Sequence, residues 1–144
     1  MIVWPHNRPS TTDMTQMHSL NPSSLHPPFA RYVHGRVVPE GKRLILTSGQ
    51  LPVRKDGSTP DGAEAQATLC FENIAAILAQ AQAGAEHVIR VNAFVTDRAH
   101  MAGYMAARDA YFAGCATPPA STLVIVTGFT RPEFLVEVEV IAAI

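Results

Sequence analysis

Two glutamates near the end of the chain, Glu137 and Glu139, have a spacing that could support acid–base chemistry. They belong to residues 135–141, a run rich in β-branched side chains that predicts a strand. Alternate side chains of a strand face opposite sides, and residues two apart lie roughly 6.5 Å from each other. One face is therefore apolar throughout, whereas the other carries both glutamates between Leu135 and Ile141. A carboxylate in such half-apolar surroundings has a raised pKa and could hold and activate a water molecule.

Two simpler readings of the glutamates stay open. The face that carries them could be exposed to solvent, as one face of an antiparallel sheet often is. Alternatively, the two carboxylates could pair with Arg36 and Arg43, which the sequence places on an earlier pair of strands.

Other candidate residues carry weaker signals. Ser48 precedes Gly49 at the end of a predicted strand, where a hydroxyl and a backbone amide could contact a ligand, and Tyr32 could stack on that ligand. Cys115 lies in a loop without an identified base, so it is more typical of a small apolar residue than of a nucleophile. The six histidines and two cysteines show no metal-ligand spacing, and no phosphate-binding or dinucleotide-binding glycine motif is present. We therefore expect no metal and no cofactor.

The composition indicates an ordinary globular domain. The chain has 144 residues, of which 47% are hydrophobic and 16% are charged, with a formal net charge of −1. This balance gives no support to nucleic-acid binding. No apolar run approaches the roughly 20 residues of a membrane span, and the first residues do not resemble a secretory signal. We expect a cytoplasmic protein with reduced cysteines.

The order of predicted elements is β-β-α-β-α-β-β. Residues 1–27 lack any period and are predicted to be a flexible, extended or disordered arm, with Trp4 as a conceivable anchor and Met14 or Met17 as conceivable alternative starts. The domain then runs from 28 to 144. Its strands are predicted at 31–38, 43–48, 88–95, 121–127 and 130–144, and its helices at 61–83, capped by Thr59 and Pro60, and at 98–112, capped by Asp97.

These elements predict one mixed sheet with both helices on one face. The first two strands should form a hairpin around the turn at 39–41, and the helical crossover to 88–95 should make that strand pair in parallel with 43–48. The sheet face that carries Glu137 would then stay uncovered in a single chain. Closing a half-apolar face against copies of the chain is the favourable solution, which predicts an oligomer with the carboxylates near its interface.

Several segments resemble the RidA/YjgF family of reactive enamine/imine deaminases. The similarity lies in Thr47-Ser48-Gly49-Gln50-Leu51-Pro52, in 65–67 and 72–74, in 91–97, in Pro119-Ala120-Ser121, and in the closing Val136-Glu137-Val138-Glu139. It implies an α+β, chorismate-mutase-like fold and a homotrimer whose sheets form a central barrel, with ligand clefts between subunits. In this family water attacks the carbon of a 2-imino acid and ammonia leaves. Glu137 matches the glutamate that positions the water, Tyr32 a cleft tyrosine, and Ser48 with Gly49 the ligand-contacting strand end.

Three positions depart from the family pattern. Ser121 stands where the family has an arginine that clamps the substrate carboxylate, Leu123 where a cysteine is common, and Met105 where a polar residue is expected. Losing a charge-assisted clamp costs on the order of 1.5–3 kcal/mol of binding. Arg31 or Arg108 could substitute for it, although nothing in the sequence shows this.

The resemblance with these departures implies a small-metabolite hydrolase whose substrate is not a simple 2-imino acid. Two alternatives remain. One is a non-catalytic trimer that binds a small ligand and regulates a partner, and the other is an endoribonuclease or translation inhibitor, a reading that the low charge does not favour. No membrane partner is expected.

Overall fold

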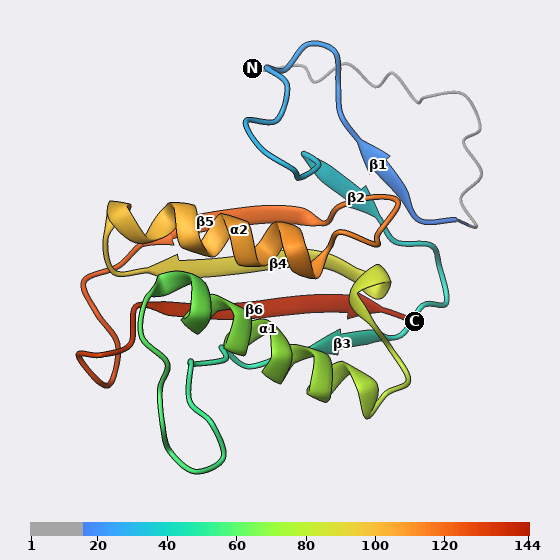
Figure 1. The fold of residues 1–144 in the computed structure, drawn as a ribbon. Helices are drawn as coiled ribbons and strands as arrows, with labels where there is room; N and C mark the ends of the chain where they lie inside the picture. Colours follow the sequence, from blue (N-terminus) through green and yellow to red (C-terminus); the bar gives the residue numbers. More distant parts are fainter. Residues whose placement is uncertain (1–15) are drawn as a thin grey trace, which may run out of the picture.

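A computed structural model describes residues 16–144 of the chain (Figure 1). Two short strands come first, and a larger sheet with two helices follows. The elements are β1 (His18–Leu20), β2 (Gly35–Val37), β3 (Leu44–Leu46), α1 (Ala63–Ala79), η1 (Ala85–His87), β4 (Val88–Val95), η2 (Arg98–His100), α2 (Met101–Tyr111), β5 (Ala120–Ile125) and β6 (Val136–Ala143).

The described strands form two sheets. The smaller one pairs β1 with β2, and the larger one has the order β3-β6-β4-β5. The predicted hairpin is therefore wrong: β2 pairs with β1, and β3 pairs with β6 in antiparallel register, with Leu44 opposite Ala143. The turn at 39–41 is real, but the backbone groups of β3 find their partners almost 100 residues later. β1 falls within the segment predicted to be a flexible arm, whereas Trp4 and Met14 lie outside the described residues.

The sequence predicted that β4, the strand after the helical crossover, pairs in parallel with β3. This prediction is also wrong. β3 and β4 are each paired with β6, one on either side of it, and both pairings are antiparallel. They therefore run in the same direction without touching. The parallel pair is instead formed by β4 and β5, which α2 connects.

Both helices cover the same face of the larger sheet, as predicted (Figure 1). Val136, Val138 and Val140 of β6 are at most 2% exposed and pack with Val91 and Val95 of β4 against the helices. The apolar stripe of α1 contributes Cys70, Phe71, Ile74 and Leu78, and α2 contributes Tyr104 and Ala107. The period of two in β6 therefore assigned its core face correctly.

The opposite face of the larger sheet, here called the open face, is not covered by any helix of residues 16–144. Leu44 is 55% exposed and Leu46 is 68% exposed, and Val124 of β5 is 43% exposed. By register, Phe94 and Glu137 are opposite each other on this face, as are Asn92 and Glu139. The face is thus part apolar and part charged, as the alternation of β6 predicts, and its closure by further copies of the chain stays a prediction.

The helix ends differ from the predicted ones. α1 begins at Ala63 after Gly62, whose φ of 83° suits glycine, so neither Thr59 nor Pro60 occupies the predicted cap positions. It ends at Ala79, before Gln82 adopts a left-handed conformation with a φ of 56°. The Asp97 cap is confirmed, because its Oδ1 accepts a hydrogen bond from the Ala99 N–H at 2.8 Å. Neither helix has the length and apolar character needed to span a bilayer within the described residues.

Candidate functional site

Glu137 lies on the open face, directly over the backbone of Gly49. A Cβ atom built at position 49 would overlap the Glu137 carboxylate and lie 2.7 Å from its Cδ. The absence of a side chain at Gly49 is therefore what allows the carboxylate to occupy this position. The sequence placed both residues at a ligand site, and the structure brings them together.

A local irregularity presents the backbone of Ser48 and Gly49 beside this carboxylate. Thr47 donates its N–H to Val140 at 3.1 Å and Gln50 donates to Val138 at 2.7 Å, so two residues stand opposite the single residue Glu139. Such a bulge leaves the extra residues outside the ladder. Among residues 16–144, the N–H groups of Ser48 and Gly49 donate a hydrogen bond to no backbone oxygen. The carboxylate therefore lies against Gly49, next to two amides that have no backbone acceptor among the described residues.

Glu139 is held by a chain of hydrogen bonds across the open face. Asn92 donates its Nδ2 to Glu139 Oε1 at 2.9 Å, and Arg90 donates its Nε to Asn92 Oδ1 at 3.0 Å. Arg90 also donates Nη2 to Thr122 Oγ1 at 2.9 Å. Neither Arg36 nor Arg43 forms an ion pair with either glutamate in the part of the chain described. The sequence reasoning missed Asn92 because its proximity to Glu139 depends on a register that only the fold fixes.

The pKa of Glu137 is raised by partial burial and, second, by the charge of Glu139. A carboxyl group with these surroundings retains a proton to a higher pH than a solvated one. It is therefore better suited to exchange a proton with a water molecule near neutral pH.

Glu137→Gln should stabilise the fold at neutral pH. Because the folded-state pKa is raised, folding favours the protonated form, and this contribution is lost as pH rises through the folded pKa. We expect the variant and the wild type to unfold alike near pH 4, and the variant to gain a higher melting temperature as pH approaches 7. Thermal unfolding across this range measures the difference, with the exposed Glu40→Gln as control; a constant offset at all pH values would contradict the prediction.

Ser121 and Leu123 lie on the other side of the sheet from Glu137. In the register of β5 they stand beside Val91 and Ala93, whose side chains face the helices. Ser121 faces Tyr104 of α2, whose pKa burial raises to about 12. The Tyr104 hydroxyl is enclosed and has no hydrogen-bond partner of acceptable geometry among the described residues. A single chain therefore does not bring Ser121 and Glu137 into one cavity.

Met105 belongs to the same side as Ser121, and Tyr32 lies next to the strand that carries Ser121. Met105 is half-buried on α2 and packs against the core cluster, as does Leu123. Tyr32 precedes Val33, which forms a bridge with Ala120 beside Ser121. The Tyr32 hydroxyl accepts a hydrogen bond from the Phe29 N–H at 3.3 Å. The predicted site residues thus form two groups, Glu137 with Ser48 and Gly49 on the open face, and Met105, Ser121 and Leu123 on the helix side, with Tyr32 next to the strand of Ser121.

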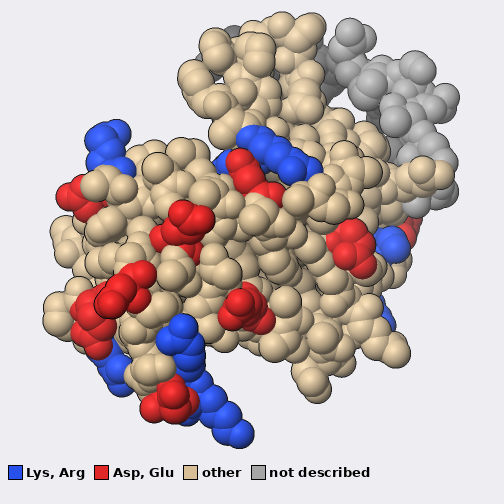
Figure 2. Space-filling model, viewed as in Figure 1, with Lys and Arg blue, Asp and Glu red and all other residues tan. Residues whose placement is uncertain are grey.

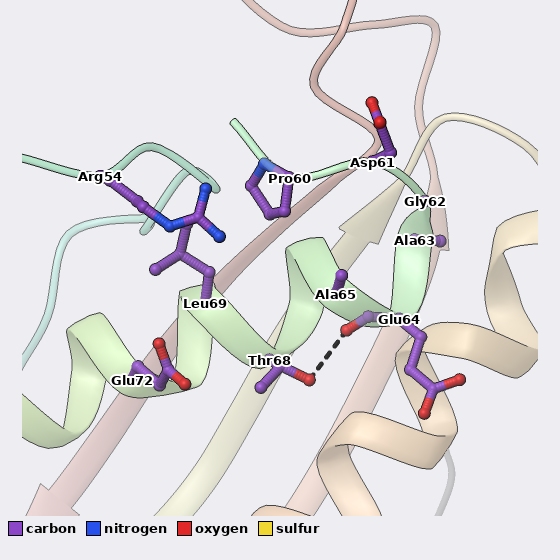
Figure 3. A pocket seen from close by; sticks show the side chains of 10 residues that line it. All are labelled: Arg54, Pro60, Asp61, Gly62, Ala63, Glu64, Ala65, Thr68, Leu69 and Glu72. Atoms are coloured by element: carbon purple, nitrogen blue, oxygen red, sulfur yellow. Dashed lines mark hydrogen bonds between the residues drawn. The ribbon is translucent and has the colours of Figure 1, made fainter. Parts of the chain in front are cut away.

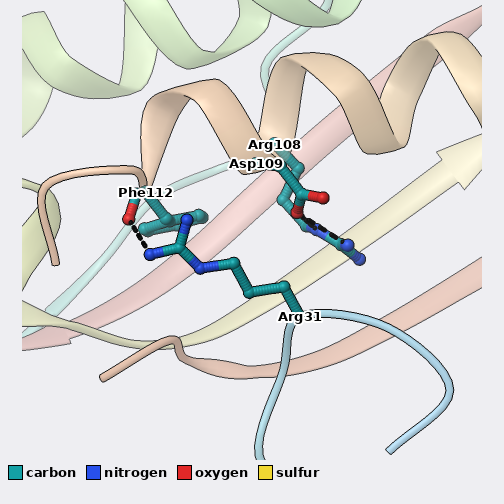
Figure 4. A network of polar contacts seen from close by, with 4 residues as sticks. All are labelled: Arg31, Arg108, Asp109 and Phe112. Carbon is teal, nitrogen blue, oxygen red and sulfur yellow. Dashed lines mark hydrogen bonds and ion pairs between the residues drawn. The ribbon is translucent and has the colours of Figure 1, made fainter. Parts of the chain in front are cut away.

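The two arginines proposed as substitutes for the clamp are engaged elsewhere (Figure 4). Arg31 donates to the carbonyl oxygens of Phe112 at 3.0 Å and of Ala113 and Cys115 at 3.3 Å, at the end of α2. Arg108 is 4% exposed and donates Nε and Nη2 to Asp109 Oδ1 at 3.0 and 2.8 Å. Both arginines therefore have structural partners. Among residues 16–144, neither forms a hydrogen bond with Ser121.

In the described part of the chain, the cysteines and histidines are not grouped as a reaction centre. Burial, followed by the charge of Glu137, raises the pKa of Cys70 to about 12. Burial and Glu86 raise the pKa of Cys115, with Arg31 and Arg36 acting in the opposite direction. Both thiols are therefore protonated at neutral pH. Within residues 16–144 no three His, Cys, Asp or Glu side chains are grouped for a metal ion.

A larger cavity lies away from both groups of site residues. It has a volume of about 670 Å³ and is lined by the loop around Arg54 and the first turns of α1, including Glu64 and Glu72 (Figure 3). The sequence named none of these residues as a site residue, although Pro60, Ala65 and Glu72 appear in its predicted helix start and family resemblance. Its lining mixes one arginine with several acidic groups, so it offers no consistent charge for a ligand.

Comparison with known proteins places the chain in a family. The profile of the family described as Endoribonuclease L-PSP matches residues 23–144. The chain belongs to this family. The family includes the Rid and YjgF proteins, which confirms the resemblance and the α+β fold.

Individual Rid relatives are similar over different lengths. The RutC family protein PM1466 of Pasteurella multocida is 36% identical over 70 residues, which are 48% of this chain and 54% of that protein. The match thus spans about half the length of that curated relative.

Among solved structures, the Rid-family protein YyfB from Yersinia pestis, of unknown function, has a TM-score of 0.78 with 25% identity, over 89% of this chain and 98% of that one. The YjgF gene product from E. coli has a TM-score of 0.65 with 31% identity, over 87% and 97%. TdcF from E. coli, solved with bound serine, has a TM-score of 0.67 with 30% identity, over 86% and 93%.

Proposed function

We propose that the chain is a small-metabolite hydrolase of the enamine/imine deaminase type. The observation that carries this proposal is the half-buried Glu137 carboxylate, held over Gly49 at a bulge where the Ser48 and Gly49 N–H groups have no backbone acceptor among residues 16–144. A raised carboxyl pKa and two adjacent N–H donors provide a proton acceptor and an anchor for a negatively polarised atom.

In the proposed reaction, Glu137 accepts a proton from water as the water oxygen bonds to the imine carbon. Glu137 returns this proton to the former imine nitrogen, so that the tetrahedral adduct carries one hydroxyl group and one amine. Glu137 then takes the proton of the hydroxyl group and passes it to the amine nitrogen. As the C–N bond breaks, ammonia leaves with the bonding electrons, and an electron pair of the oxygen forms the carbonyl. Atoms and charge balance with water as the sole co-reactant, so the site needs no metal or cofactor for this step.

The complete cleft in this proposal needs two copies of the chain. The Glu137 group and the Ser121 group lie on opposite sides of one sheet, so only a neighbouring copy can place the helix-side group against Glu137. The exposed Leu44 and Leu46 on the open face supply an apolar surface for such contact. A homotrimer, which the family resemblance implies, would close the open faces around a shared centre and create the ligand clefts between subunits.

The substrate in this proposal is less acidic than a simple 2-imino acid. Ser121 provides no positive charge, and Leu123 and Met105 make the helix-side wall apolar. Figure 2 shows basic and acidic side chains mixed over the visible face, without a continuous basic band, so this view offers no support for the endoribonuclease alternative. The missing arginine favours one other candidate, a regulatory trimer that binds a ligand in the same cleft without converting it.

Ser121→Arg should increase hydrolysis of 2-iminobutanoate by about tenfold to a hundredfold, because it restores a charge-assisted partner for the carboxylate. The measurement is the loss of freshly generated imine, for 2-iminobutanoate and for its uncharged amide analogue, with wild type and variant side by side. The wild type should prefer the amide. Binding without turnover of either compound would favour the regulatory trimer instead, and a wild type that prefers the acid would contradict the proposed specificity.

A further inference from the structure

A second, smaller cavity lies at one end of the open face. Here Ile141 of β6, Arg90 of β4 and Ala120 of β5 are neighbours in register and form a row across three strands. Gly35 and Arg36 of β2 lie against this row and enclose a cavity of about 200 Å³ with it. Glu137, Ser48 and Gly49 do not line this cavity, and Glu137 is four residues from Ile141, roughly 13 Å along the strand.

Two guanidinium groups from different sheets line this cavity with neutral partners only. Arg36 donates Nη1 to the carbonyl oxygens of Thr117 at 3.3 Å and Pro118 at 3.2 Å. Its Nε is enclosed and has no hydrogen-bond partner among the described residues. Arg90 donates to Asn92 and Thr122, both uncharged.

No carboxylate of residues 16–144 pairs directly with either arginine, and the Glu139 carboxylate is linked to Arg90 only through the side-chain amide of Asn92. No Asp or Glu lines the cavity, and the ion pairs found in residues 16–144 involve neither arginine. Partial burial lowers the pKa of Arg36, with Cys115 acting in the opposite direction, which shows that the charge is held at a free-energy cost. An anion in the cavity would reduce this cost.

We propose that this cavity between β2 and the open face binds a small oxyanion through Arg36 and Arg90. The guanidinium fork matches the paired oxygen atoms of a carboxylate or a phosphate, and two forks from different sheets can hold one anion from two sides. The third polar residue of the lining, His34, has its Nε2 2.8 Å from the His26 carbonyl oxygen. The site is independent of the proposed hydrolase cleft and would fasten the small sheet to the large one.

The test is isothermal titration calorimetry on the full chain with inorganic phosphate and with malonate, in a chloride background. We expect a Kd of about 1 mM or lower for at least one of them. Arg36→Gln and Arg90→Gln should each weaken binding by about tenfold or more, and the corresponding lysine variants by less, because lysine keeps the charge but not the fork. Arg98→Gln, at an exposed arginine outside the cavity, is the matched control.

The phosphate and malonate titrations distinguish a phosphorylated ligand from a carboxylate ligand. Preference for malonate would assign a carboxylate ligand and preference for phosphate a phosphorylated one, and either supports the site. Absence of binding by the wild type at 10 mM of both ions, about ten times the expected Kd, would overturn the proposal. Equal weakening in the Arg98→Gln control would overturn it too, because a general charge effect would then explain the binding. Glu137→Gln should retain anion binding, which separates a failure here from a failure of the hydrolase proposal.

Discussion

Glu137→Gln is expected to lower imine hydrolysis by about a hundredfold to ten-thousandfold, the range typical of a lost general base. Glutamine has nearly the same shape and should fit over Gly49, but its amide cannot accept a proton from water. The expected loss therefore lies in kcat, with substrate binding largely retained. Steady-state kinetics on the best imine substrate of the wild type, followed by ammonia release, measures both parameters.

The matched control for this prediction is Glu72→Gln, an exposed glutamate on α1. It removes the same charge from the helix side of the molecule and should leave kcat within about twofold, as a surface substitution away from the site usually does. If Glu137→Gln keeps full activity while the fold is intact, Glu137 does not position the water and the mechanism proposed above is wrong.

Phe71→Ala is expected to destabilise the fold by about 3–5 kcal/mol, as for other large-to-small core substitutions. Phe71 is 2% exposed and lies at the centre of an aromatic cluster that joins the two helices. Its ring centroid is 4.8 Å from that of Tyr111, 5.9 Å from that of Phe112 and 6.2 Å from that of Tyr104. Removing the ring leaves a cavity between α1 and α2 that the rigid sheet beneath them cannot close.

Urea unfolding at one fixed protein concentration measures this loss, since oligomerisation would otherwise add a concentration-dependent term. Phe29→Ala is the matched control because Phe29 is 85% exposed, and its removal should change stability by less than about 0.5 kcal/mol. Similar losses in both variants would show that the aromatic cluster is not the main contact between the helices.

The fold could be predicted from the sequence where the signal was local and periodic. The alternation in β6 identified its buried face, and the helical spacing of α1 identified most of its stripe, although Ile77 is 36% exposed. Strand partners were not predictable in this way. Nothing near β3 in the sequence indicates that it pairs with β6. Every strand offers the same backbone N–H and C=O groups, so its local sequence does not specify which strand it pairs with.

The sequence named residues for the candidate site but could not give their arrangement in space. The resemblance named Glu137, Gly49 and Ser121, and periodicity placed Glu137 on the uncovered face. The close approach of Gly49 to Glu137 depends on the bulge at Ser48, and the placement of Ser121 on the helix side depends on the register of β5 with β4. Both are consequences of tertiary pairing, as is the hydrogen bond between Asn92 and Glu139.

The most direct test of a cleft shared between copies is a mixing experiment with two inactive variants. Glu137→Gln disables the open-face group, and Ser121→Trp blocks the helix-side group, so each variant alone should hydrolyse no imine. When the two are refolded together, random mixing should give roughly a quarter of the clefts an intact residue from each side and restore about that share of wild-type activity. If native mass spectrometry shows mixed oligomers and no activity returns, the two groups do not form one site, and the central claim is contradicted.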